Sequence, residues 1–161
     1  MNTFIPKPGQ VDFTNIRWCP VINCICFYGD EFLLLKRSAT MRLYPGYYNG
    51  VAGFIDDDKS LNEKVYEELR EEIGVTQKDV VSIELRGVFT QDAPEIGKTW
   101  VVHAIKVQLA HNTIVTDWES ESYIWTNKEE VKNLFVLPGL PQVLDVVLGE
   151  PNRVIGSGMQ F

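Results

Sequence analysis

Hydrophobic and polar residues alternate through the first third of the chain in a pattern that predicts β-strands. Residues 17–27 and 31–37 are two such runs, rich in Val, Ile, Leu, Cys and Phe, and a Tyr-Gly-Asp turn at 28–30 separates them. The first run is long enough to cross a sheet, and the second ends in Lys-Arg. Together they predict a β-hairpin near the start of the chain.

Between residues 61 and 73 the apolar spacing lengthens from two to four, which indicates a helix. Ser60 followed by Glu63 is the pattern of a capping box, so we expect the helix to begin at Leu61, and Gly74 supplies a left-handed end. The expected buried face consists of apolar residues at every fourth position and one aromatic residue, namely Leu61, Val65, Leu69, Ile73 and Tyr66.

Alternation returns in the second half of the chain. It predicts two strands, at 80–91 and 99–109, joined by a polar loop over 91–98. A short strand at 123–127 leads into a helix, and a last amphipathic helix is expected from Leu140 to Leu148, followed by a frayed end.

Length and charge bound the class of protein. The chain has 161 residues, 45% of them hydrophobic, which suits a single domain over residues 1–161 with residues 1–15 as an N-terminal arm or short edge strand. A net charge of -7 argues against a nucleic-acid duplex or an anionic membrane surface as the main partner. The sequence shows neither an apolar run of ~20 residues nor a secretory signal, so we expect a cytoplasmic location.

The chemistry of the chain centres on the carboxylates of the helix at 61–73. Glu68, Glu71 and Glu72 stand at positions i, i+3 and i+4, so their side chains share one stripe of the helix. Like charges at this spacing destabilise an isolated helix, which predicts that a cation compensates them. Hard oxygen ligands grouped in this way suit Mg²⁺, with Mn²⁺ as the alternative.

The stretch from Gly53 to Val75 resembles the Nudix box, a fixed pattern of glycines, glutamates and aliphatic residues. Two positions depart from that pattern, because Lys59 replaces a glutamate and Glu67 replaces an arginine. The resemblance implies an α/β fold, a Nudix-like α/β/α sandwich around a mixed β-sheet, over roughly residues 17–148. The matching residues are Gly53, Glu68, Leu69, Glu71, Glu72, Gly74 and Val75.

The two departures are opposite in charge and admit two interpretations. In the family the glutamate and arginine pair braces the loop against the helix, so a pair between Lys59 and Glu67 would preserve the brace with its charges exchanged. Eight helical residues rise about 12 Å, and the loop must therefore fold back for the two to meet. The alternative is drift at a site that no longer matters. We favour the exchange, because the metal-facing carboxylates are unchanged.

The resemblance implies a metal-dependent hydrolase that cleaves the phosphoanhydride bond of a nucleoside diphosphate linked to another group. By the same resemblance Glu68 is the candidate base, Glu71 and Glu72 are metal ligands, and the carbonyl of Ala52 helps to hold the metal. Glu119, six residues before the tryptophan of the strand at 123–127, is a further candidate ligand or base, with Glu121 as its substitute.

Substrate-binding candidates lie on either side of the box. Arg37, at the end of the second strand, could point its guanidinium at a phosphate. Tyr48 could stack on a base, as could Tyr44 and Tyr47, and the Asn49 amide could bond a base edge. The loop at 91–98 offers further polar side chains that could reach a ligand, at Gln91, Asp92, Glu95 and Lys98.

Two other functions share this fold. One is a nucleotide-binding or sensing domain with an impaired box, which the departures at Lys59 and Glu67 would support. The other is an isopentenyl diphosphate isomerase, which needs a catalytic cysteine, whereas Cys24 and Cys26 fall with Ile22 on one face of an expected core strand. Relatives of this fold are often dimers, so the resemblance also allows a homodimer through the N-terminal arm.

Overall fold

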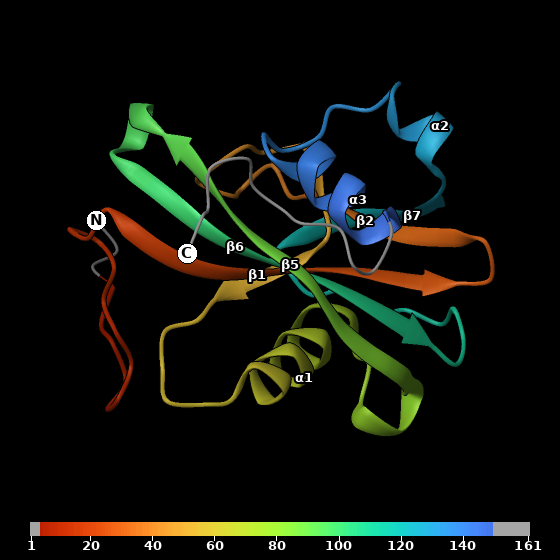
Figure 1. The fold of residues 1–161 in the computed structure, drawn as a ribbon, viewed down its shortest axis with the longest axis horizontal. Helices are drawn as coiled ribbons and strands as arrows, with labels where there is room; N and C mark the ends of the chain where they lie inside the picture. Colours follow the sequence, from red (N-terminus) through yellow and green to blue (C-terminus); the bar gives the residue numbers. More distant parts are fainter. Residues whose placement is uncertain (1–3, 150–161) are drawn as a thin grey trace.

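The structure, a computed structural model, describes residues 4–149. A mixed sheet of seven strands separates two helical layers (Figure 1). The strands are β1 (Trp18–Tyr28), β2 (Glu31–Arg37), β3 (Tyr48–Asn49), β4 (Val51–Phe54), β5 (Val80–Ala93), β6 (Lys98–Leu109) and β7 (Ser120–Thr126). The α-helices are α1 (Leu61–Ile73), α2 (Lys128–Val131) and α3 (Leu140–Leu148), and two 3₁₀ turns cover Gln77–Asp79 and Pro94–Ile96.

Strand β1 is the centre of the sheet. It runs parallel to β6 over its whole length, from Trp18 opposite Thr99 to Phe27 opposite Gln108. On its other side it pairs antiparallel with β4 over residues 21–24 and with β2 at 27–28. Strand β2 also pairs with β3 and β7, and β5 pairs with β6. The mixed sheet predicted from the resemblance is confirmed.

The alternation along β1 divides the core into two layers. Ile22, Cys24 and Cys26 belong to the cluster packed against α1. Ile25 and Phe27 belong to the cluster packed against α3. Figure 1 shows these two helices on opposite faces of the sheet, which confirms the α/β/α sandwich.

Helix α1 has the predicted bounds. Ser60 Oγ accepts a hydrogen bond from the Glu63 N–H at 3.2 Å, and Gly74 ends the helix at φ +67°. Glu63 does not return a bond to Ser60 among the described residues, so only half of the predicted capping box forms. Residues 65, 69 and 73 are fully buried, whereas Tyr66 is only partly buried.

Three predicted segments differ from the structure. The strand expected at 123–127 is β7, which already begins at Ser120 and ends at Thr126. The loop over 91–98 is shorter than expected, because the ladder between β5 and β6 continues until Ala93 pairs with Lys98. Within residues 4–17 no strand forms, so the N-terminal segment is an arm rather than an edge strand. The frayed end predicted after residue 149 lies outside the described residues. No helix among residues 4–149 has the length and apolar character needed to cross a membrane.

Candidate functional site

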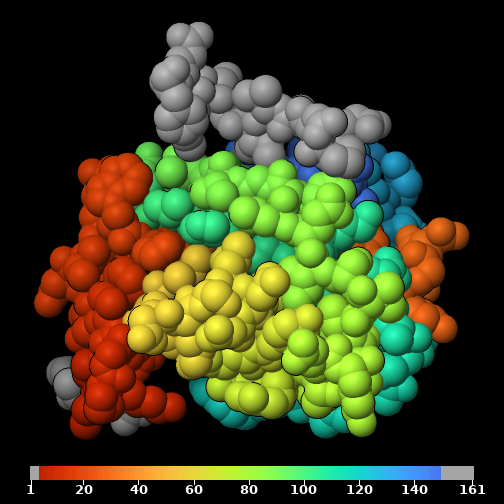
Figure 2. All heavy atoms as spheres, turned by 60° about the horizontal axis from the view of Figure 1, so that its bottom comes forward, coloured from red at the N-terminus to blue at the C-terminus, as the bar shows by residue number. Residues whose placement is uncertain are grey.

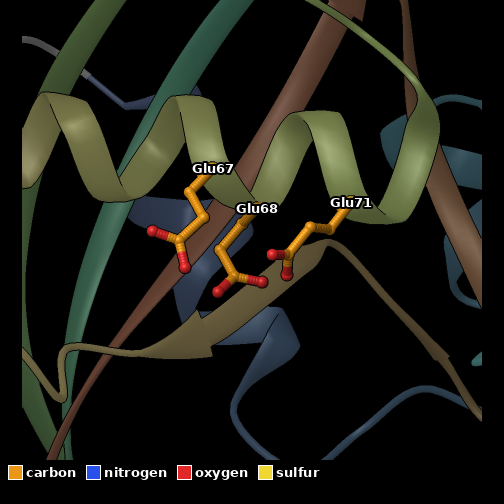
Figure 3. A group of neighbouring side chains, drawn as sticks. All are labelled: Glu67, Glu68 and Glu71. Carbon is orange, nitrogen blue, oxygen red and sulfur yellow. The ribbon is translucent and has the colours of Figure 1, made fainter. Parts of the chain in front are cut away.

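Helix α1 directs a group of carboxylates toward β4. In Figure 3 the side chains of Glu67, Glu68 and Glu71 point to the same side of the helix. One carboxylate oxygen from each lies within 4.8 Å of the others. This group contains Glu67, whereas the sequence pattern grouped Glu72 with the other two. The difference arises because Glu72 is buried and lines a separate small cavity.

Glu72 is the most enclosed carboxylate of the site. Its exposed fraction is only 7%, and its Oε2 has no hydrogen-bond partner among the described residues. It lines a small cavity of about 30 Å³ together with Arg37, Ala52 and Glu119. Burial, and then the negative charge of Glu68, raise the pKa of Glu72. An unpaired buried carboxylate oxygen is costly in an apolar setting, and a cation in this cavity would compensate it.

The Glu68 carboxylate lies against Gly53 of β4, and the absence of a side chain on Gly53 leaves space for it. A Cβ on Gly53 of β4 would lie 2.3 Å from the Glu68 Cδ, closer than any real contact. The glycine therefore allows the carboxylate to rest against the strand backbone. Burial, and then the charge of Glu71, raise the pKa of Glu68 to about 7.

These carboxylates fit a divalent cation. Oxygen donors are the ligands that Mg²⁺ and Mn²⁺ prefer, and the mutual repulsion that raises these pKa values is what a bound cation would remove. Glu68, Glu71 and Glu72 could hold the ion from α1. Glu119, which precedes β7, lines the same small cavity as Glu72 and could add a ligand.

Glu121, the alternative to Glu119 as a metal ligand or base, is paired with a lysine. Glu121 forms an ion pair of 3.2 Å with Lys36. Glu119 makes no ion pair within residues 4–149, and burial, followed by the charge of Asp117, raises its pKa. The structure therefore favours Glu119 over Glu121 as the acidic group of this loop.

The two departures from the box pattern meet in space. Nζ of Lys59 lies 2.6 Å from Oε2 of Glu67 and 3.1 Å from Oδ2 of Asp57. The loop before α1 folds back onto the helix, as the exchange interpretation required. The prediction of a Lys59–Glu67 pair is confirmed.

The brace contains a second cation, Lys64, which the sequence pattern does not predict. Lys64, only 2% exposed, lies 3.2 Å from Asp56, 2.8 Å from Asp57 and 3.5 Å from Glu67. It joins the loop to α1 from inside. Position 64 is not one of the fixed positions of the box. The only sign of its role in the sequence is that this lysine comes directly before Val65, which lies on the expected buried face of the helix.

Among the substrate-binding candidates, Arg37 lies beside the carboxylates of the site. Arg37 lines the small cavity beside Glu72 and Glu119, and its Nε donates to the carbonyl of Leu43 at 2.8 Å. Burial lowers the pKa of the Arg37 guanidinium, although the nearby charge of Glu119 opposes that shift. Arg37 is therefore the candidate that the structure brings to the carboxylates.

Tyr48 and Asn49 are less available to a base. The Tyr48 side chain packs against the core cluster beneath α3, on the opposite face of the sheet from α1. Asn49 is buried, and its Oδ1 accepts a hydrogen bond from Asn23 Nδ2 at 2.9 Å. Tyr44 and Tyr47 contact each other edge to face, with ring centroids 5.7 Å apart.

Three of the polar residues of the 91–98 segment are engaged within the chain. Asp92 accepts a hydrogen bond from Thr99 Oγ1 at 2.7 Å, and Glu95 accepts one from the Tyr44 hydroxyl at 3.1 Å. Lys98 donates to backbone carbonyls of the N-terminal arm, including that of Ile16 at 2.7 Å. These contacts connect the β5–β6 turn to neighbouring segments.

The cysteines of β1 have no place in the chemistry. Cys24 and Cys26 are fully buried between the sheet and α1, and burial raises the pKa of both thiols. A protonated thiol enclosed by a core cannot serve as a nucleophile or acid toward a bound substrate. The structure thus argues against an isomerase that relies on cysteine.

Comparisons with known proteins agree with this geometry. The family model described as "NUDIX domain" matches residues 17–145. The chain is 25% identical over 131 residues to "Uncharacterized Nudix hydrolase YvcI" of Bacillus subtilis, covering 80% of this chain and 78% of that protein. It is 37% identical over 89 residues to "NAD-capped RNA hydrolase NudC" of Chromobacterium violaceum, a match that covers 55% of this chain and 30% of that protein.

A solved structure shares the fold. The NUDIX domain of NrtR from Shewanella oneidensis, crystallised with ADP ribose, superposes with a TM-score of 0.66 at 18% sequence identity. The superposition covers 79% of this chain and 84% of that one. At this level of identity the likeness supports the architecture of the sheet and helices.

Proposed function

The chain belongs to the NUDIX family, and on that premise we propose that it is a metal-dependent hydrolase of the phosphoanhydride bond in a nucleoside diphosphate linked to another group. Nudix hydrolase is the class that the family match establishes. The bond, the metal and the substrate class are the proposal. We place the activity in one domain over residues 1–161, with residues 1–15 as its arm.

One observation carries the proposal. The buried Oε2 of Glu72 has no hydrogen-bond partner among residues 4–149, and it borders a small cavity shared with Glu119 and Arg37. A bound cation would stabilise a carboxylate in that position, whereas an unpaired buried carboxylate destabilises the folded protein. Cleavage of a pyrophosphate requires that the negative charge of the phosphates be neutralised. A cation held by Glu72 and Glu119, together with the Arg37 guanidinium, would supply that neutralisation.

Each residue has a role in this proposal. Glu71, Glu72 and Glu119 would hold Mg²⁺, or Mn²⁺ in its place, with Glu68 and the carbonyl of Ala52 as further ligands. The bound cation supplies neutralisation of phosphoryl oxygens and a lower pKa for water. Glu68 would accept the proton of the attacking water as general base, from its position against Gly53 and beside Glu71.

The substrate class is inferred from the site and from the molecules named with two similar proteins. NAD-capped RNA and ADP ribose, named with two of the similar proteins, both contain a diphosphate that joins two groups. Arg37 would bind a phosphate oxygen of such a diphosphate from its position beside Glu119. The burial of Asn49 and the packing of Tyr48 toward α3 do not support base contacts by these two residues.

The partner in this proposal is a small nucleotide derivative, bound by a cytoplasmic protein. A homodimer through the arm remains a prediction from the resemblance. The arm is held by its own chain, through Asp56, which accepts from Gln10 and Val11, and through Lys98, which donates to the carbonyl of Thr14.

The test is a substrate panel with a matched pair of variants. Phosphate or nucleotide release is measured on nucleoside triphosphates, sugar nucleotides, dinucleotides and dinucleoside polyphosphates, with and without Mg²⁺. Glu72→Gln removes a proposed ligand, and Glu63→Gln makes the same change on an exposed position of α1. We expect metal-dependent turnover that falls at least about 100-fold in the Glu72 variant and stays near wild type in the Glu63 variant.

Either of two results would contradict the proposal. Turnover that persists in Glu72→Gln would show that catalysis does not need this carboxylate. Binding of a panel nucleotide, seen as thermal stabilisation without turnover of any member, would favour a nucleotide-sensing domain with an impaired box. The ion pair between Lys59 and Glu67 argues against that outcome, because the brace of the catalytic loop is kept.

A further inference from the structure

The N-terminal arm forms one wall of a cavity that contains catalytic carboxylates. This cavity, of about 310 Å³, has the arm residues 7–10 on one side and Glu67, Glu68 and Glu71 of α1 on the other. The loop at 56–59 forms its floor. In Figure 2 the red N-terminal segment lies beside the yellow residues that lead into α1. The space is large enough for the phosphate portion of a nucleotide derivative.

Two hydrogen bonds fix the arm to the loop of the metal site. Gln10 Nε2 donates to Oδ2 of Asp56 at 2.7 Å, and the N–H of Val11 donates to the Asp56 carbonyl at 2.6 Å. Asp56 also binds Lys64 from the side of α1. Asp56 therefore connects the arm to Lys64 of α1, the helix that carries the carboxylates.

The arm itself forms a turn at the cavity. The Lys7 N–H donates to Oε1 of Gln10 at 3.0 Å, and the Gln10 N–H donates to the Lys7 carbonyl at 2.9 Å. Gly9 takes φ +82° in this turn, a conformation that a side chain would disfavour. Farther along, the Phe13 ring stacks on Phe54 of β4 at 5.8 Å. The turn is closed by its own hydrogen bonds and is anchored to the rest of the chain after Gly9, through Gln10, Val11 and Phe13.

The charges of the wall identify the residue that is free to bind a ligand. Lys59 and Lys64 also line the cavity, but both are engaged by Asp57 and Glu67. Lys7 is exposed and makes no ion pair within residues 4–149. Its ammonium group is therefore available to an anion that enters beside Glu68 and Glu71.

We propose that the turn at residues 7–10 is a binding wall of the catalytic cleft, in which Lys7 binds a phosphate oxygen of the metal-complexed diphosphate. The identity of this ligand rests on the proposed function. Three lysines and six acidic side chains line the cavity, so a bare anion is disfavoured and a diphosphate that carries Mg²⁺ is favoured. Lys7 thus recognises the substrate and takes no part in proton transfer.

The test compares Lys7→Met with Lys128→Met, an equal loss of charge on exposed helix α2 outside this cavity. Binding of inorganic pyrophosphate with Mg²⁺ is measured by calorimetry. We expect about tenfold weaker binding in the Lys7 variant, near wild-type binding in the Lys128 variant, and recovery in Lys7→Arg. With a substrate from the panel, KM should rise while kcat changes little.

The outcomes separate this inference from the proposed function. Equal pyrophosphate binding by wild type and Lys7→Met, or no binding by wild type, would overturn the role of the arm even if the panel shows turnover. Weaker binding in Lys7→Met with no turnover of any panel member would support the arm as a diphosphate site and contradict the hydrolase.

Discussion

Nζ of Lys59 lies 2.6 Å from Oε2 of Glu67, across a loop that folds back onto α1. The pair exchanges the charges that the box pattern carries at these positions while keeping the contact between loop and helix. Oε1 of Glu67 also faces Lys64 at 3.5 Å. Because Glu67 precedes Glu68 in the chain, this contact orients the turn of α1 from which the proposed base projects.

The first prediction concerns that pair. Lys59→Glu should bring a third carboxylate next to those of Glu67 and Asp57, and the repulsion among the three should lower the free energy of unfolding. It should also lower kcat/KM about tenfold through the displaced loop. The double variant Lys59→Glu with Glu67→Arg should restore most of both quantities. Thermal denaturation and steady-state kinetics measure them, and a double variant no better than the single one would show that the contact is incidental.

Lys64 should matter more for stability than Lys59. It is 2% exposed and pairs with Asp56 and Asp57, so Lys64→Met leaves the mostly buried Asp56 without its cation and Asp57 with Lys59 alone. We expect the free energy of unfolding to fall by about 3 kcal/mol in urea denaturation. Lys132→Met, which removes an exposed partner of Glu129, should cost less than about 0.5 kcal/mol. Equal losses in the two variants would contradict the role of Lys64.

Local sequence patterns predicted much of the fold. The bounds of α1, β2 and α3 agree with the structure because their caps, turns and apolar spacing are encoded within a few residues. The predicted β5–β6 loop is too long. Polar side chains such as those of Gln91 and Asp92 are typical of loops, although the backbone of both residues continues the ladder with β6. Pairing across strands depends on a partner that a local pattern does not contain.

The site was predicted where its geometry follows from helical spacing. Positions 68, 71 and 72 share a stripe of α1, but spacing alone does not show that Glu72 is buried or that Glu67 lies with Glu68 and Glu71. The pairing of Lys59 with Glu67 was inferred from complementary charge. Lys64 and the arm were missed because their contacts depend on how the loop at 55–60 folds back.

Gly53 supplies a third prediction. A Cβ at this position would lie 2.3 Å from Cδ of Glu68 and 2.4 Å from its Oε1, so Gly53→Ala should push the carboxylate away from the strand. We expect kcat to fall about 10- to 100-fold, while the melting temperature changes by only a few degrees. Kinetics at saturating Mg²⁺ and thermal denaturation test this. Full activity would mean that Glu68 does not act from its position against β4.

The last prediction is a pH dependence of metal binding. Burial and the charge of Glu71 raise the pKa of Glu68 to about 7 in the metal-free protein, above its ordinary value. The folded state therefore holds this proton more tightly than the unfolded chain does. The resulting stabilisation is complete below the ordinary pKa, near 4.5, and is lost as the pH rises to about 7.

A divalent cation needs the deprotonated carboxylate, so it competes with that proton. The affinity for Mg²⁺ should weaken by up to about tenfold per pH unit below pH 7 and level off above it. Mg²⁺ should accordingly raise the melting temperature more at about pH 8 than at about pH 5.5. Calorimetric titration across this range measures the affinity, with Glu68→Gln as the comparison, since the variant keeps the shape of the side chain but cannot titrate. A flat profile in wild type would contradict a metal site that includes Glu68, whereas a slope that flattens in the variant would assign the competing proton to this residue.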